Sequence, residues 1–512
     1  MGLLDSERVR NSLRASIACG LAMGGLMVFP TSSPGVLIES DLDPAPTLPA
    51  SLGSGWSARP VGSATRPPAN PFLAKGAWSN IHNDTWMTDA YPGAGPLGLD
   101  PVSTSGASVG GLGLCASLAF DRFGRIVSVC PSSIGPPRAQ IIDPDSLELI
   151  ASLTLPDAAP VGDTPVYQDY TGGGYFFLDQ RKWLWVPTRT NHLKVLEPLA
   201  GSAGFRVRRD IDLSGVLDPE RERITSVLPD FQGRVWFVSK QRGVVGTWNP
   251  ATGRIRSVRL GEWIQNSFAV DRKGVYVVSD RRLYRFGADR SGKPRIDWKA
   301  TYRNSGQTKP GQADDGSGTT PTILKGGFVA ITDNADPMNV VVYRTGIRLA
   351  KGEERKVCEV PVFEAGASAT ENSLIGTGRS LVVENNYGYT NPFVPEGPAL
   401  STAGLARVDI AANGRSCRKV WTNDQVRAPT LVPKMSNSTG LIYLYERPED
   451  PGGSEGYYWS AVSFHTGERV WRHYAGSGVL FNNNYAGIML GPDGTAYLGV
   501  IGGLVSLRDT SG

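Results

Sequence analysis

The stretch FDRFGRIVSV, residues 120–129, reads as two short apolar strands joined by a tight turn at Gly124. The same phrase returns as PDFQGRVWFV (229–238), VDRKGVYVV (270–278) and LGPDGTAYLGV (490–500). Weaker copies carry Gly326, Gly378 and Gly440 at the turn. If one copy between Gly124 and Gly233 is unrecognised, the mean spacing is about 53 residues, which is typical of repeat architectures. Because each unit reads as strands, the repeat predicts a β-propeller.

A second turn follows the first in each unit. It is found in DPDSLELIASLTL (143–155), NPATGRIRSVRL (249–260), IAANGRSCRKVW (410–421) and FHTGERVWRHY (464–474). Two hairpins give four antiparallel strands, the content of one propeller blade. The expected blade starts are Leu114, Tyr175, Ile224, Asn266, Thr320, Asn372, Ala428 and Tyr485. The sequence therefore predicts an all-β, eight-bladed propeller, or seven blades if the unit around Trp183 and Trp185 is not a repeat.

The last unit is short, so we expect a strand from the N-terminal part, within Ala77–Leu97, to complete it and close the ring. Before that segment, residues 1–30 combine arginines with a short apolar run, which predicts a signal peptide or an uncleaved signal-anchor. Residues 31–70 are rich in Pro, Ser and Gly and predict an extended tether. Residues 71–512 are expected to form one propeller domain. The expected location is secreted or in the cell envelope, with membrane contact only through an uncleaved N-terminal segment.

The net charge and the cysteines narrow the kinds of partner and the disulfides that we expect. The net charge is +4 and no basic stripe is visible, so nucleic acid is not an expected partner. Four of the five cysteines, Cys115, Cys130, Cys358 and Cys417, lie in the repeats and predict two disulfides in an exported chain. Cys115 and Cys130 flank one hairpin turn. Cys358 and Cys417 occupy strand positions of neighbouring repeats.

The phrase HTGERVWRHY, with its relatives NGRSCRKVW and RSGKPRIDW, resembles the tryptophan-bearing repeat of quinoprotein-type (PQQ-like) β-propellers. Trp298, Trp421 and Trp471 stand at the matching place, where the family packs a tryptophan between blades. The resemblance implies the fold and not the cofactor. Quinoprotein alcohol dehydrogenases carry two adjacent cysteines against the quinone, and this chain has no such pair. PQQ is therefore not expected.

Polar residues gather where the innermost strands are expected to start. Long loops are expected at the same rim, at residues 302–319, 385–405 and 446–457, and long loops on a rigid scaffold often bind ligands. The candidate ligand-binding residues are Asn266, Thr320, Asn372, Arg427, Asn483 and Glu446. The competing interpretation is a hydrated channel mouth without a ligand. A protein-binding rim would instead use aromatic side chains, for which the candidates are Tyr387, Tyr389, Phe393, Tyr457, Tyr458 and Trp459.

Two further interpretations concern chemistry at this rim. Asp333, Asn334, Glu384 and Asn385 offer the oxygen ligands that calcium prefers, so calcium is the candidate cofactor if there is one. His82, acting with Asp84 or Glu384, is the candidate general base. The sequence thus predicts an exported propeller that binds a small molecule or a protein at the rim of its channel. The alternative is a calcium-type propeller hydrolase or lactonase, or a lyase, and whether the protein is an enzyme stays open.

Overall fold

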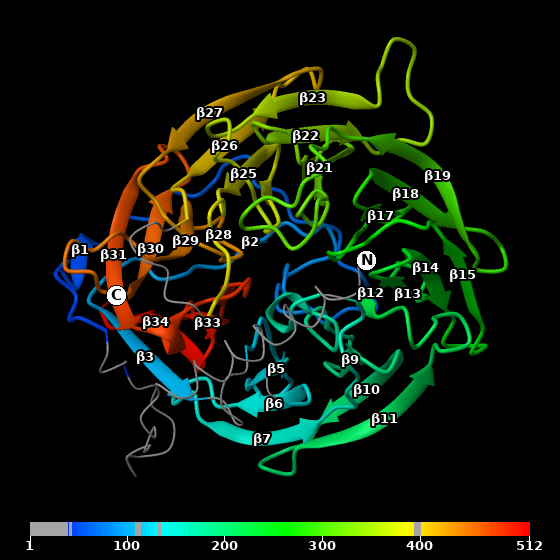
Figure 1. Cartoon of the computed structure of the whole chain (residues 1–512), viewed down its shortest axis with the longest axis horizontal. Helices are drawn as coiled ribbons and strands as arrows, with labels where there is room; N and C mark the ends of the chain where they lie inside the picture. Colours follow the sequence, from blue (N-terminus) through cyan, green and yellow to red (C-terminus); the bar gives the residue numbers. More distant parts are fainter. Residues whose placement is uncertain are drawn as a thin grey trace, which may run out of the picture.

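Eight β-sheets stand in a ring around a central channel (Figure 1). The computed structural model describes residues 39, 43–107, 114–131, 135–162, 164–393 and 401–511. Each sheet is a blade of four antiparallel strands, with additional strands on the seventh, and the innermost strand of each of the first seven blades is the first in chain order. Eight blades are thus confirmed, and the seven-bladed alternative is excluded.

The strands of the first four blades are β4 (Ser117–Phe120), β5 (Ile126–Cys130), β6 (Arg138–Ile142) and β7 (Leu149–Thr154); β8 (Phe177–Leu178), β9 (Leu184–Pro187), β10 (His192–Pro198) and β11 (Phe205–Asp212); β12 (Ile224–Pro229), β13 (Val235–Ser239), β14 (Val244–Trp248) and β15 (Ile255–Arg259); β16 (Ala269–Val270), β17 (Val275–Val278), β18 (Arg282–Ala288) and β19 (Pro294–Thr301).

The strands of the last four blades are β20 (Thr322–Leu324), β21 (Phe328–Thr332), β22 (Asn339–Arg344) and β23 (Lys356–Pro361); β24 (Ile375–Thr377), β25 (Ser380–Glu384), β26 (Leu405–Ile410) and β27 (Cys417–Asn423); β28 (Lys434–Ser436), β29 (Leu441–Glu446), β30 (Gly456–Ser463) and β31 (Arg469–Ser477); β32 (Met489–Leu490), β33 (Ala496–Val500) and β34 (Gly503–Asp509) with β3 (Pro101–Ala107). Two single turns, η1 (Val166–Gln168) and η2 (Val479–Phe481), are the helices of the described ranges, and neither is long and apolar enough to cross a membrane.

The eighth blade is completed by an N-terminal strand, but not by the expected one. β3 pairs antiparallel with β34 from Pro101 opposite Asp509 to Ala107 opposite Gly503. The prediction that residues 77–97 supply this strand is wrong. Asn83, Met87 and Asp89 have φ between 54° and 59°, a left-handed conformation that interrupts an extended strand.

Residues 70–91 lie instead across the inner end of the blades. The backbone N–H groups of Val270, Ile323 and Gly376, in or beside three successive innermost strands, donate to the carbonyls of Thr85, Trp86 and Thr88. β2 (Ala90–Tyr91) then pairs in parallel with β28. We call residues 70–91 the channel segment, because it ties most of the blades together at the axis.

Part of the expected tether also lies on the propeller. β1 (Ser51–Gly53) pairs with β31 at the outer edge of the seventh blade, and Arg59 and Val61 donate backbone hydrogen bonds to the hairpin turn of the same blade. The expected signal segment, residues 1–30, lies outside the described residues.

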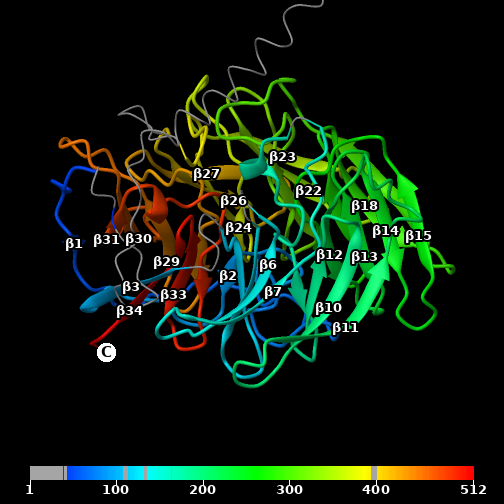
Figure 2. The same cartoon turned by 60° about the horizontal axis from the view of Figure 1, so that its bottom comes forward.

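The repeat that escaped notice in the sequence is the turn from Asp179 to Trp183. Lys182 takes the position that Gly124 and Gly233 occupy elsewhere, with φ 58°. Asp179 accepts hydrogen bonds from the backbone of Arg181 and Trp183 and from Trp185 Nε1, as Asp230 does for its own turn. These bonds hold the turn without glycine. The tight turns of the blades lie on one face of the ring, the turn face, and the connections between blades lie on the other, the loop face (Figure 2).

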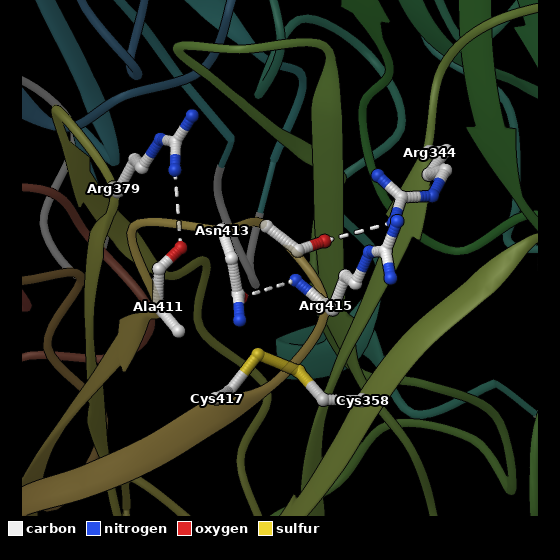
Figure 3. The surroundings of a disulfide bond; sticks show 8 residues. Arg344, Cys358, Arg379, Ala411, Asn413, Arg415 and Cys417 are labelled. Atoms are coloured by element: carbon white, nitrogen blue, oxygen red, sulfur yellow. Dashed lines mark hydrogen bonds between the residues drawn. A yellow bond between two sulfur atoms is a disulfide. The ribbon is translucent and has the colours of Figure 1, made fainter. Parts of the chain in front are cut away.

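Both expected disulfides are present. Cys115 and Cys130 form a bridge around the first hairpin of the first blade. Cys358 and Cys417 join the outermost strands β23 and β27 of neighbouring blades, and we call this bridge the interblade disulfide (Figure 3). Beside it, Arg379 donates to the Ala411 carbonyl at 3.0 Å. The interblade disulfide thus adds a covalent link to a junction that is also held by packing and hydrogen bonds.

Candidate functional site

A small space, the chamber, lies on the channel axis between the channel segment and the loop face. Its volume is about 20 Å³, close to what one ordered water molecule needs. It is bounded by residues from the channel segment and from several blades. The lining residues are Ile81, His82, Ala116, Tyr170, Gly174, Tyr175, Asn266, Glu371, Asn372, Ser373, Val432 and Tyr485.

The floor of the chamber is a buried charge network. His82 Nδ1 lies 3.0 Å from Asp89 Oδ2, and Lys434 of β28 forms an ion pair with the other oxygen of Asp89. Lys434 Nζ also donates to the Ile81 carbonyl. The side chains of Lys434 and Asp89 are fully buried. The network therefore fixes the channel segment to the seventh blade.

On the chamber side, His82 faces a serine. His82 Nε2 lies 3.5 Å from Ser373 Oγ, while Ser373 Oγ also accepts the backbone N–H of Thr320 at 3.2 Å. Burial lowers the pKa of His82 below its ordinary value, against the opposing effect of Asp89. A neutral imidazole between a carboxylate and a hydroxyl group has the arrangement of a general base.

The wall beside Ser373 is a network of carboxyl and amide groups. The Asn372 and Asn386 side-chain amides both donate to Glu384 Oε1, and Glu371 Oε2 accepts the backbone N–H of Ala313 at 3.1 Å. Several buried side-chain oxygens nevertheless have no hydrogen-bond partner within the described part of the chain. They are Glu371 Oε1, Asn372 Oδ1, Glu384 Oε2, Gln265 Oε1 and Thr320 Oγ1.

Burial raises the pKa of the acidic groups in this wall. The pKa of Glu384 rises to about 8, and that of Glu371 rises well above its ordinary value because of burial and, to a smaller extent, the nearby Asp314. Lys240 opposes the shift of Glu371. At neutral pH the Glu384 carboxyl group is therefore largely protonated, and burial favours the neutral form of Glu371 as well.

Tyrosines close the chamber toward the loop face. Tyr485 makes edge-to-face contacts with Tyr170 and Tyr389, with ring centroids 5.7 and 5.9 Å apart. Their hydroxyl groups are held by hydrogen bonds, as in the contact of Tyr389 with Asn484 Oδ1 at 3.1 Å. We call these three side chains the tyrosine roof. Tyr170 and Tyr485 line the chamber directly, and Tyr389 packs against Tyr485.

The structure places only some of the predicted ligand-binding residues at the chamber. Asn266 and Asn372 line the chamber, and Thr320 lies behind Ser373. Asn483 instead donates to the Gly499 carbonyl, Glu446 forms an ion pair with Arg469, and Arg427 donates to the Ser401 carbonyl. The latter three are not among the residues that line the chamber.

The predicted metal ligands are spread over two blades. The Asp333 carboxylate accepts hydrogen bonds from Ala335 and Asn339 within its own turn, and Asn334 donates to backbone carbonyls of the 302–319 loop. Glu384 does not line the chamber itself but accepts a hydrogen bond from Asn372, which does. Asn385 is bonded to the backbone of Ala367 and Ala369. In the described ranges no group of three or more His, Cys, Asp or Glu side chains has the arrangement of a metal site.

The two predicted catalytic residues do not face each other. The imidazole of His82 is bonded to Asp89, whereas Asp84 accepts the Trp86 N–H at 2.8 Å and the Thr88 hydroxyl group. Asp84 lines a different cavity, on the turn face. Sequence reasoning missed Asp89, Lys434 and Tyr170, and it named Tyr389 of the tyrosine roof only as a candidate for protein binding. Asp89 and Lys434 are 345 positions apart, so only their shared burial in the fold brings them together.

Comparisons with known proteins give the fold. No protein-family model matches the chain. An uncharacterised protein of Archaeoglobus fulgidus is 28% identical over 486 residues, which cover 87% of this chain and 89% of that protein. A quinohemoprotein alcohol dehydrogenase from Pseudomonas putida HK5 superposes with a TM-score of 0.50 at 12% identity, over 85% of this chain and 80% of that one. A europium-containing methanol dehydrogenase gives 0.50 at 11% identity, over 84% and 90%. The chain is thus an eight-bladed propeller structurally similar to PQQ dehydrogenases.

The chamber does not fit the quinone of those enzymes. A space of about 20 Å³ cannot hold a fused-ring quinone, and the channel segment forms its floor. The sequence also has no pair of adjacent cysteines. No step of chemistry is therefore assigned to that cofactor.

Proposed function

We propose that the protein binds a small positively charged ligand in the chamber, either a metal cation or a molecule with a primary ammonium group. The observation that carries the proposal is the pair of buried oxygens Glu371 Oε1 and Asn372 Oδ1. Both residues line the chamber, and neither oxygen has a donor in the described part of the chain. An unsatisfied buried acceptor costs about 1–3 kcal/mol. A cation would satisfy both oxygens at once.

The charge of the wall supports the same ligand class. Glu371 and Glu384 keep raised pKa values because burial disfavours their ionised forms. A bound cation would favour the carboxylate form of Glu371 and neutralise it. Oxygen-rich walls of this kind suit hard cations and ammonium groups equally, so the metal and the amine are separated by the experiment below.

Burial of the aromatic side chains argues for a small molecule over a protein partner. Tyr389, Tyr457, Tyr458 and Trp459 are each at most 3% exposed, so they are not available as a docking surface. Protein hot spots usually present such residues at the surface of the free molecule. These four side chains instead pack the seventh blade and the tyrosine roof, whereas Tyr387 and Phe393 are half-buried.

Isothermal titration calorimetry of the full chain with calcium chloride, magnesium chloride and methylammonium chloride tests the proposal. We expect one of the cations to bind, and Glu371→Gln to weaken its binding at least about tenfold, since a charged acceptor is lost. Asp333→Asn is the matched control, because Asp333 is also buried but its oxygens are satisfied within a turn. Binding that is unchanged by Glu371→Gln but lost in Asp333→Asn would instead support the sequence-based metal site. No binding by any cation would refute the proposal.

Hydrolysis is the second candidate, because Ser373, His82 and Asp89 follow one another as nucleophile, base and orienting carboxylate do in serine hydrolases. The Ser373–His82 separation is 3.5 Å and the His82–Asp89 separation 3.0 Å. Asp89 is shared with Lys434, so its role here includes holding the channel segment. Incubation with a small fluorophosphonate followed by mass spectrometry tests this candidate. A single adduct on Ser373 that is absent in Ser373→Ala supports it, and an unmodified protein argues against it.

A further inference from the structure

A second cavity lies on the turn face, on the other side of the channel segment. Its volume is about 280 Å³, and almost all of its wall comes from residues 65–92, with Asn437 as the contribution of a blade. It shares none of its lining residues with the chamber. His82 and Asn83 are neighbours in the chain but face different cavities. The chamber's 20 Å³ is close to what one water needs, so the much larger cavity has room for a small organic ligand.

Three residues that line this cavity each carry a buried side-chain oxygen that has no partner in the described residues. These oxygens are Thr65 Oγ1, Asn83 Oδ1 and Thr85 Oγ1. Asn83 and Thr85 are only 1% and 2% exposed, so solvent does not readily satisfy them. The Asn83 amide nitrogen already donates to the Ala90 carbonyl at 3.1 Å, which leaves the oxygen as its free end. An amide oxygen only accepts, so Asn83 requires a donor from the ligand.

A carboxyl group lies between these two residues in the chain. Asp84 lines the cavity, and each of its oxygens accepts one hydrogen bond, from the Trp86 N–H and from the Thr88 hydroxyl group. A carboxylate oxygen can accept a second bond. Asp84, Asn83 and Thr85 together present the acceptors that a primary ammonium group, with its three donors, would need.

The rest of the wall is apolar with cations at its edge. Pro67, Pro68, Leu73, Ala77 and Pro92 provide the apolar lining. Arg66 and Lys75 line the cavity and are exposed. Neither has an ion-pair partner within the ranges that the structure describes. An exposed cation at the mouth suits an anionic group at the outer end of a ligand.

We propose that this cavity binds a small zwitterion with an apolar body, of the chemical class of an apolar α-amino acid. Its ammonium group contacts Asn83, Asp84 and Thr85, its carboxylate faces Arg66 and Lys75, and its side chain packs against the prolines and Leu73. The site is independent of the chamber and of the function proposed for it.

Calorimetric titration of the full chain with alanine, valine, leucine and phenylalanine tests the site. For each amino acid that binds, the matching amine without the carboxylate and the matching acid without the amine are titrated as well. We expect at least one amino acid to bind and both of its halves to bind at least about tenfold more weakly, since each lacks one charge-assisted contact. No binding by any of the four, or equal binding of the amine alone, would overturn the proposal.

Variants locate the binding. Thr85→Val removes a buried hydroxyl group that has no partner in the described structure, so it should weaken amino-acid binding while keeping or raising the thermal stability of the free protein. Asp84→Asn should weaken binding about tenfold or more, and Arg66→Ala with Lys75→Ala should remove the advantage of the amino acid over its amine. Glu371→Gln, in the chamber, is the control and should leave amino-acid binding unchanged. Binding lost in Glu371→Gln but kept in Asp84→Asn and Thr85→Val would overturn the assignment.

Discussion

Replacing Lys434 with methionine removes one end of the buried ion pair that ties the channel segment to the seventh blade. Lys434 and Asp89 are both fully buried, and Lys434 Nζ also donates to the Ile81 carbonyl. Methionine has a similar length and no charge, so it keeps most of the packing. Asp89 is left with His82 as a partner, whose own pKa is lowered by burial.

Removing one partner of a buried pair costs about 3–5 kcal/mol, because an uncompensated charge remains. His82 remains 3.0 Å from Asp89 and can take up a proton, so we expect the low end, about 3 kcal/mol. The double variant Asp89→Asn with Lys434→Met removes both charges. It should be destabilised by less than the sum of the two single changes, with a coupling energy of about 1–3 kcal/mol.

Equilibrium urea unfolding of the full chain, followed by tryptophan fluorescence, measures these differences. Lys325→Met is the control, because Lys325 is exposed in a hairpin turn and its replacement should stay within about 0.5 kcal/mol of the parent. If Lys434→Met is as stable as this control, or if the two single changes add in the double variant, the pair does not hold the channel segment and the reasoning fails.

The remaining predictions concern the disulfides and pH. Replacing both cysteines of the interblade disulfide with serine should lower the free energy of unfolding by about 4 kcal/mol, because these cysteines are 59 positions apart. The same change at the hairpin bridge, whose cysteines are 15 positions apart, should lower it by about 3 kcal/mol. Urea unfolding that shows the opposite order would contradict this. Burial raises the pKa of Glu384 from 4.5 to about 8, so the stability that its protonated form contributes is present below pH 4.5 and lost as the pH rises through 8. Glu384→Gln should therefore flatten the decline in unfolding free energy between pH 4.5 and 8, and an unchanged slope would show that Glu384 does not cause it.

Much of the fold could be predicted because glycine marks many of its tight turns in the sequence. Gly124, Gly233, Gly274 and Gly494 mark the first hairpin of four blades, and three of them have positive φ. The turn with Lys182 could not be recognised in the same way, because a lysine in the sequence does not indicate a residue with positive φ. Its aspartate, Asp179, was the available signal, because Asp121 and Asp230 bond the same turn elsewhere.

The closing strand was placed too early for a related reason. Residues 77–97 and β3 both precede the first blade, and nothing in the spacing distinguishes them. The distinction lies in conformation, since the channel segment contains left-handed residues at Asn83 and Asp89 and β3 contains none. The polar residues of the stretch 80–89 lie at the channel axis, where His82 and Asp89 belong to the buried charge network.

The candidate site was predictable in part. Asn266 and Asn372 stand at the starts of innermost strands, so topology alone brings them to the axis. The floor was not predictable, because Asp89 and Lys434 become partners only through the course of the channel segment. Asp84, grouped with His82 by proximity in the chain, faces the opposite cavity because the backbone turns at Asn83, where φ is 59°.

Proton release on cation binding tests the central claim most directly. Burial raises the pKa of Glu371 well above its ordinary value, and a cation bound beside this carboxyl group would lower that pKa again, so cation binding should release protons. Calorimetric titrations in two buffers of different ionisation enthalpy, repeated at several pH values, should therefore report net proton release on cation binding. The release should be absent in Glu371→Gln. Cation binding without proton release, or with the same release in Glu371→Gln, would contradict the assignment of the ligand to the chamber.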